Sequence, residues 1–191
     1  MKRLVLSLMA ICTFGFANAQ KKVSKVSSEE KSYSSSADQT EVGSWLIEAN
    51  TGFGGDGGVG STQFGLTSRD GKTSYNIGLE GGYFVIDDLA LKVGLGYGGS
   101  SESGSISALT YKIGAKYYIS RMIPVELSYT GVSVSGASEN PSYVGLQAGY
   151  ALFLGKNVSV EPGLRYNYAL LSKDKGGISN LQFNIGFALH F

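Results

Sequence analysis

Charged side chains that alternate with apolar ones have the greatest capacity for chemistry in this sequence. In the segments that carry them, apolar residues hold every second position, so the charges gather on the opposite face of an extended chain. That face carries four carboxylates and four cationic groups: Glu48, Glu80, Lys92, Lys112, Lys116, Glu126, Glu161 and Arg165. Because an unpaired charge held away from water is costly, we expect these groups to pair with one another. Lys116 and Glu126 are expected to pair across a short turn.

The sequence contains few residues that would form an enzyme active site. Its only histidine is His190, which falls on the same polar face as the charges. We find no GxSxG motif, no cluster of metal-ligating residues and no phosphate-binding loop. The closely spaced glycines before Phe64 are typical of turns. We therefore expect no catalytic residues, no cofactor and no metal site.

The clearest structural element is the stretch Leu181–Phe191, which reads LQFNIGFALHF. Leucine, isoleucine or phenylalanine holds every second position, and polar or small residues lie between them. A period of two predicts a β-strand with one apolar face. A tilted strand needs about 9–11 residues to cross a bilayer, and this stretch is long enough.

Seven further segments show the same alternation, at about residues 44–54, 73–84, 89–98, 107–119, 124–132, 142–154 and 158–170. The connections after the second, fourth and sixth segments are short, whereas the others are polar and mostly longer. An even number of strands with connections of alternating length is typical of a membrane barrel. We predict an all-β fold over residues 44–191, an eight-stranded antiparallel up-and-down transmembrane β-barrel. Pro162 lacks a backbone N–H, so we expect a β-bulge in the seventh strand.

The N-terminal region is predicted to be a targeting signal followed by a spacer. A basic pair and an apolar run precede the small-residue pattern Ala17–Ala19, so residues 1–19 are predicted to be a signal peptide. The mature chain is then expected to begin at Gln20. Cys12 would allow a lipoprotein signal, but the residue before it is not small, and this alternative is disfavoured. Residues 20–43 are Ser-rich and lack apolar periodicity, which predicts a disordered periplasmic extension.

Charge and composition exclude some partners. The formal net charge is +1, which gives no indication of a nucleic-acid partner. Only 16% of residues are charged, while glycine and tyrosine are abundant, as a barrel with a lipid-facing exterior requires. After the signal peptide no apolar run reaches the about 18 residues of a transmembrane helix.

The signal peptide, the alternating strands, the hairpin GYFVIDDLALKVGLGY and the aromatic last strand resemble the small outer-membrane β-barrel proteins of the OmpX and OmpA-barrel type, a porin-like architecture. The resemblance covers residues 44–191. It implies a location in the outer membrane of a Gram-negative-type bacterium, with both termini in the periplasm and outer-membrane lipid around the barrel. It also implies that Phe187, Leu189 and Phe191 form the signal read by the outer-membrane assembly machinery.

The predicted barrel leaves three functions open. Because an eight-stranded barrel has room for side chains but little else, the charges favour a plugged lumen and a structural or surface-interaction role. The alternative is a passive small-solute pore, in which the same charges line the path. A lipid-modifying enzyme is least favoured, since His190 faces the lumen at the periplasmic end. The polar loops identify no extracellular ligand.

Overall fold

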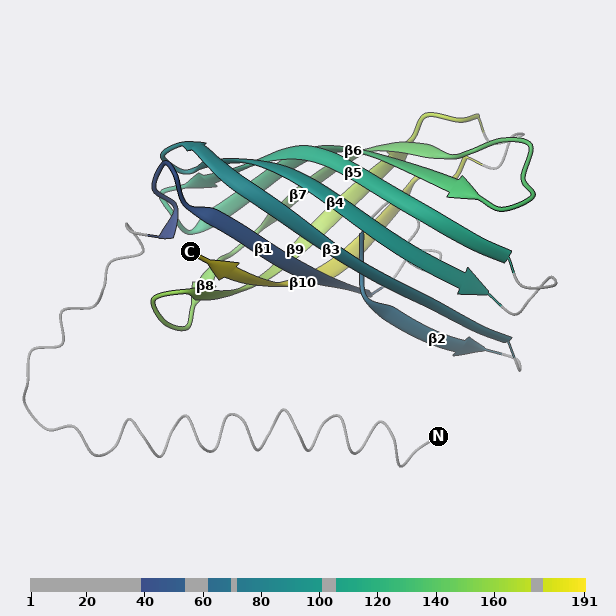
Figure 1. The fold of residues 1–191 in the computed structure, drawn as a ribbon, viewed down its shortest axis with the longest axis horizontal. Helices are drawn as coiled ribbons and strands as arrows, with labels where there is room; N and C mark the ends of the chain where they lie inside the picture. The colour runs from purple at the N-terminus through teal and green to yellow at the C-terminus, as the bar shows by residue number, and fades with distance from the viewer. Residues whose placement is uncertain (1–38, 54–61, 70–71, 101–105, 173–176) are drawn as a thin grey trace, which may run out of the picture. The chain divides into compact units, whose positions relative to one another are not determined.

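The computed structural model describes residues 39–53, 62–69, 72–100, 106–172 and 177–191. The predicted signal peptide and residues 20–38 of the predicted extension lie outside this part of the chain. The described residues form a β-barrel (Figure 1). None of the described segments is a helix long and apolar enough to cross a membrane.

Ten strands are present among the described residues, and their pairings are antiparallel. They are β1 (Trp45–Phe53), β2 (Gly65–Arg69), β3 (Lys72–Ile86), β4 (Leu89–Ser100), β5 (Ile106–Ile119), β6 (Ile123–Val134), β7 (Ser142–Gly149), β8 (Leu152–Phe153), β9 (Val158–Ala169) and β10 (Asn180–His190). The hydrogen-bonded order is β1-β10-β9-β7-β6-β5-β4-β3, and β1 also pairs with β3, which closes the sheet. Since β8 continues β7 along β9 and β2 continues β1 along β3, the closed wall has eight strands. The predicted eight-stranded up-and-down barrel is confirmed.

The barrel is polar inside and apolar outside. In β10 the side chains of Gln182, Asn184 and His190 are buried, whereas Phe183 and Leu189 between them are exposed. The other long strands repeat this alternation, because successive side chains point to opposite faces of a sheet. Pairing of β1 with β3 closes the eight-stranded wall, and the apolar exterior suits hydrocarbon rather than water. The outer surface is therefore a lipid-contacting face.

Three short turns and the C-terminal residue lie at one end of the barrel, hereafter the turn end. The turns follow β3, β5 and β8, as predicted for the second, fourth and sixth strands. Asp88, Ser120 and Arg121 have φ values of 65°, 51° and 61°, which tight reversals require. Figure 1 shows the C-terminus at the same end as β8. The opposite end, hereafter the loop end, carries the other connections.

Pro162 interrupts a hydrogen-bond ladder without shifting its register. The pairings of β7 and β8 with β9 follow one continuous register on both sides of this residue. The N–H of Tyr150 donates to the carbonyl of Pro162 at 3.0 Å, but proline has no N–H to donate in return. The missing bond separates β7 from β8. The predicted β-bulge at Pro162 is therefore wrong, because a closed wall can lose one bond more easily than it can change register.

A short segment, Thr62–Phe64, lies beside β1 and β3 and buries the side chains of Thr62 and Gln63 in the lumen. The two strands pair with each other through residues 45–48 and 80–83, near the turn end. Closer to the loop end, the N–H of Phe64 donates to the carbonyl of Asn50 at 2.7 Å. Thr62 lies against Gly78, where a Cβ atom would be 2.8 Å from the Thr62 carbonyl carbon. Only glycine allows this close approach.

Residues 39–43 cover the turn end of the barrel. Gln39 and Thr40 are buried. The Gln39 side-chain amide donates to the carbonyl of Gly155 at 2.5 Å, and the Thr40 hydroxyl donates to Asp88 Oδ1 at 2.5 Å. Residues 39–43, which the predicted disordered extension includes, are therefore hydrogen-bonded to the barrel. This segment is held by hydrogen bonds rather than by an apolar face, so its polar sequence does not reveal it.

Candidate functional site

All eight charged residues predicted for the lumen lie inside the barrel, and none is more than 3% exposed. They come from six strands: Glu48 on β1, Glu80 on β3, Lys92 on β4, Lys112 and Lys116 on β5, Glu126 on β6, and Glu161 and Arg165 on β9. Each stands at an inward position of its strand, because the alternation of the strand places it there. The barrel thereby gathers charges that are far apart in the sequence.

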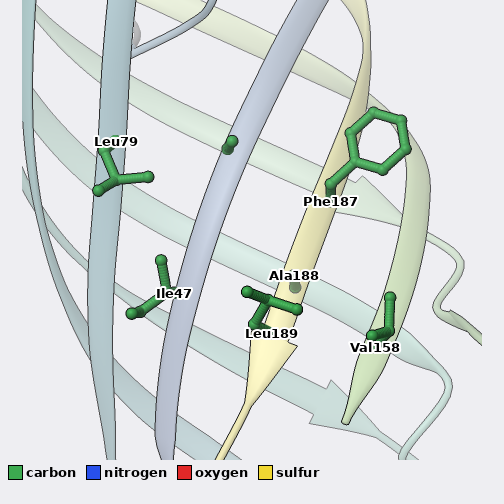
Figure 2. Close-up of a pocket in the computed structure, with 7 residues that line it drawn as sticks. Ile47, Leu79, Val158, Phe187, Ala188 and Leu189 are labelled. Carbon is green, nitrogen blue, oxygen red and sulfur yellow. The ribbon is translucent and has the colours of Figure 1, made fainter. Parts of the chain in front are cut away.

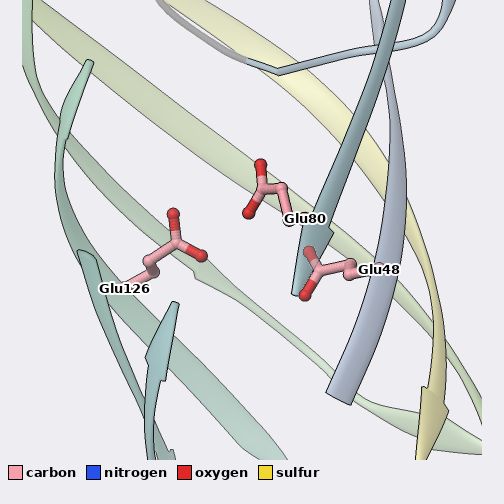
Figure 3. A group of neighbouring side chains, drawn as sticks. All are labelled: Glu48, Glu80 and Glu126. Atoms are coloured by element: carbon pink, nitrogen blue, oxygen red, sulfur yellow. The ribbon is translucent and has the colours of Figure 1, made fainter. Parts of the chain in front are cut away.

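Lys92 lies between three carboxylates. Its Nζ atom is 2.9 Å from Glu48 Oε2, 2.6 Å from Glu80 Oε2 and 2.7 Å from Glu126 Oε2. Figure 3 shows these glutamates converging from β1, β3 and β6. The ammonium group donates hydrogen bonds to Glu48 and Glu126 and forms an ion pair with Glu80. Lys92 is therefore the centre of the lumen charge network.

The same three glutamates have the spacing of a cation site. One oxygen of each lies within 4.8 Å of those of the other two. Carboxylate oxygens at such spacing suit a hard cation such as Ca²⁺. In this barrel the Lys92 ammonium group stands at contact distance from all three carboxylates. The chain thus supplies the neutralising cation from its own sequence.

Glu126 also forms ion pairs with Lys112 and Arg165. Lys112 Nζ is 2.6 Å from Glu126 Oε1 and 2.7 Å from Glu80 Oε1, and Arg165 Nη1 is 3.0 Å from Glu126 Oε1. The Arg165 guanidinium lies over Gly145, where a Cβ atom would be 2.2 Å from Nη2. Its remaining donors reach three neutral acceptors: Ser128, Gln147 and Asn167.

Lys116 links two further carboxylates near the turn end. Its Nζ atom is 2.6 Å from Glu48 Oε2 and also contacts Glu161 Oε2. Glu161 in turn accepts hydrogen bonds from the hydroxyl groups of Tyr118 at 2.8 Å and Ser159 at 3.0 Å. Together with the contacts above, this gives a continuous path of ion pairs through the lumen: Arg165–Glu126–Lys92–Glu48–Lys116–Glu161.

The pairing predicted between Lys116 and Glu126 is wrong. The two residues are opposite each other in the β5–β6 register, but the charged group of each contacts other partners. Lys116 reaches across the lumen to Glu48 and Glu161 on non-neighbouring strands. Glu126 contacts Lys92, Lys112 and Arg165. The register of neighbouring strands therefore does not determine which charges pair.

We expect Lys116→Ala to lower the free energy of unfolding by about 3 kcal/mol, because it leaves Glu48 and Glu161 each short of a buried partner. The loss stays near the low end of the range for broken buried pairs, since Glu48 retains Lys92. Denaturant unfolding of the refolded protein measures the change. Lys156→Ala, at an exposed turn position, is the control. Equal losses in the two variants would contradict the expected role of Lys116.

Neutral polar side chains, which the sequence analysis did not single out, occupy the lumen on the loop-end side of the charges. The amide of Gln63 donates to Gln182 at 2.9 Å, and that of Asn184 donates to Asn50 at 3.3 Å. Asn50, Gln182 and Asn184 occupy the same alternate, inward-facing strand positions as the charged residues, so the alternation in the sequence predicts them as well. Gln63 lies outside the regular strands, so no periodicity marks it.

Apolar side chains cluster in the lumen on both sides of the polar region. The cluster at the turn end is formed by Leu46, Phe84, Ala90, Tyr118, Ala151 and Ala188. The smaller cluster at the loop end is formed by Val132, Tyr143 and Ala169. The charge network is thus flanked by apolar groups along the barrel, which keeps its ion pairs away from bulk water.

Ser159 and His190 are the described residues that most resemble part of a catalytic site. Ser159 Oγ is 3.0 Å from His190 Nε2. The other ring nitrogen, Nδ1, is 3.0 Å from the carbonyl oxygen of Gln39 rather than from a carboxylate. Both side chains are at most 1% exposed, whereas a nucleophile has to reach its substrate. The His190 side chain therefore links β9 to residue 39, and Ser159 is not an accessible nucleophile.

A closed antiparallel barrel with an ion-paired interior and an apolar exterior is a transmembrane β-barrel. No family model matches the chain, and no curated protein sequence matches it. Among solved structures, it is similar to the outer membrane protein OprG from Pseudomonas aeruginosa, with a TM-score of 0.45 and 12% identity, covering 79% of this chain and 97% of that one. It is also similar to the outer membrane protein Ail from Yersinia pestis, with a TM-score of 0.44 and 12% identity, covering 78% and 99%. A de novo designed transmembrane β-barrel gives a TM-score of 0.45 and 14% identity, covering 80% and 99%.

Proposed function

We propose that this protein is an outer-membrane β-barrel with a structural or surface-interaction role, and that the side chains in its lumen prevent conduction. The observation that carries the proposal is the continuous path of ion pairs from Arg165 to Glu161. An eight-stranded barrel has little space beyond its own side chains. Passage of a solute would require buried pairs to separate, and an uncompensated buried charge costs several kcal/mol.

The same proposal places the barrel in the outer membrane of a Gram-negative-type bacterium, with the turn end in the periplasm. The short turns support this orientation, because outer-membrane barrels have short periplasmic turns and longer external loops. Phe191 and residues 39–43 lie at the turn end, so both ends of the described chain would face the periplasm. Outer-membrane lipid is then the partner of the apolar exterior.

Assembly is proposed to depend on the outward side chains of Phe187, Leu189 and Phe191. They are exposed on the lipid-contacting face of the last strand and at its end. A protein that contacts β10 before the barrel closes can bind these side chains directly, because they point outward. We assign that reading to the outer-membrane assembly machinery.

Refolded wild-type protein is expected to give no steady conductance in a planar lipid bilayer, because ion pairs and apolar clusters occupy its lumen. A porin inserted in the same membrane is the positive control, and insertion of the protein is checked by protease protection. Stepwise ohmic conductance of inserted wild-type protein would overturn the plugged lumen and favour the passive pore.

A further inference from the structure

A groove of about 290 Å³ lies on the outer face near the turn end. It is lined by apolar side chains from four neighbouring strands (Figure 2): Ile47, Ala49, Leu79, Val158, Phe187 and Leu189. In the wall, β1 lies between β3 and β10, so Leu79 stands on one side of β1 and Phe187 on the other. The groove is therefore a recess in the lipid-contacting face.

Small outward residues create the recess. Ala49 is opposite Phe187 in the β1–β10 register, and Gly81 is opposite Ile47 in the β1–β3 register. A Cβ atom on Gly81 would meet nothing within 4 Å. Leu79 and Phe187, in contrast, are 57% and 51% exposed and project into the surroundings. Small side chains therefore lie between two large ones that project from the outer face.

Aromatic residues mark the end of the groove nearest the turn end. The rings of Trp45 and Tyr83 lie 5.0 Å apart between centroids, on β1 and β3. Such outward aromatic residues sit at the level of lipid headgroups. Ala49 is four residues farther along β1 than Trp45, about 13 Å at the usual rise of a strand. The groove therefore runs from the headgroup level into the hydrocarbon region.

Only an apolar occupant suits this position. A bound water needs two to four polar partners, and the lining residues are all apolar. An empty recess would forfeit dispersion contacts with its walls. The groove is continuous with the face that contacts lipid, and a flexible alkyl chain can follow a narrow recess that a second barrel could fill only with a matching ridge.

We propose that this groove binds one acyl chain of a membrane lipid, with the lipid headgroup beside Trp45 and Tyr83. Lipid tails are as apolar as leucine, so the preference arises from close packing rather than from removal of apolar surface from water. The inference goes beyond the proposed function but depends on its lipid-facing exterior.

Trp45 is the only tryptophan of the chain and serves as the reporter. The refolded full chain is placed in phosphatidylcholine vesicles that contain increasing fractions of phosphatidylcholine brominated along its acyl chains. A chain held in the groove should add a saturable component of Trp45 quenching to the quenching by random lipid contact. Ala49→Phe fills the groove and should lose that component. Ala115→Phe, at an outward alanine of β5, should retain it.

An unchanged saturable component in Ala49→Phe would overturn the proposal, and so would wild-type quenching that follows only the bulk fraction of brominated lipid. A wild-type dimer that Ala49→Phe dissociates would assign the groove to a second copy and also overturn it. If Ala49→Phe does not fold, Ala49→Leu provides the same readout with a smaller side chain. Failure of the wild-type barrel to enter vesicles would instead contradict the proposed function.

Discussion

Lys92→Met should lower the free energy of unfolding by about 3–5 kcal/mol, the range for removing one partner of a buried ion pair. Methionine retains most of the length and the apolar stem of lysine but has no charge. The substitution leaves Glu48, Glu80 and Glu126 facing one another around a neutral side chain. Their mutual repulsion adds to the loss of the ammonium group. Denaturant unfolding of the refolded protein measures the change.

Two comparison variants separate this effect from a general effect of substitution. Lys156→Met, at an exposed turn position, should alter the unfolding free energy by no more than about 0.5 kcal/mol. Combining Lys92→Met with Glu126→Gln should recover part of the loss, since the double variant again has equal numbers of carboxylates and cationic groups in the lumen and the two sites are in contact. A single Lys92→Met variant as stable as the Lys156→Met control would refute a stabilising charge network.

The fold was predictable because lipid and lumen make opposite demands on alternate residues. A strand between two such media has to alternate strictly, and a one-residue slip would place every apolar side chain in the lumen. The last strand, predicted over Leu181–Phe191, is observed as Asn180–His190 with the expected faces. The same parity identified which charged residues face inward, since a charge on the outer face would be costly in hydrocarbon.

The partners of the charges were not predictable in the same way. The alternation along a strand indicates which side of the wall a residue faces. The contact between Lys116 and Glu48, however, depends on how the closed wall brings non-neighbouring strands together. Segments that are held in place by hydrogen bonds also show no alternation of apolar residues in the sequence. Thr62–Phe64 and residues 39–43 are in this group, since both are short and mostly polar, as ordinary loops are. The interruption at Pro162 depends on the wall as a whole, which holds its register although one bond is missing.

Replacing Phe191 by alanine should reduce the amount of protein in the outer membrane of cells far more than it reduces the stability of refolded protein. The Phe191 side chain is 63% exposed, so its removal should cost no more than about 1–3 kcal/mol by area burial. The backbone of Phe191 exchanges two hydrogen bonds of 3.0 Å with Trp45, and alanine retains both. Closure of the barrel is therefore preserved, and a larger loss in cells points to a step before closure.

Phe183→Ala is the matched control for this step. Phe183 is also an outward phenylalanine of β10 and is 43% exposed, but it lies outside the proposed signal of Phe187, Leu189 and Phe191. Outer-membrane levels in cells are compared with denaturant unfolding of the refolded variants. We expect the Phe191 variant alone to show the excess loss in cells, because recognition depends on position whereas lipid contact does not. Normal assembly of that variant would refute the signal, and equal losses in both assays would leave Phe191 a packing role only.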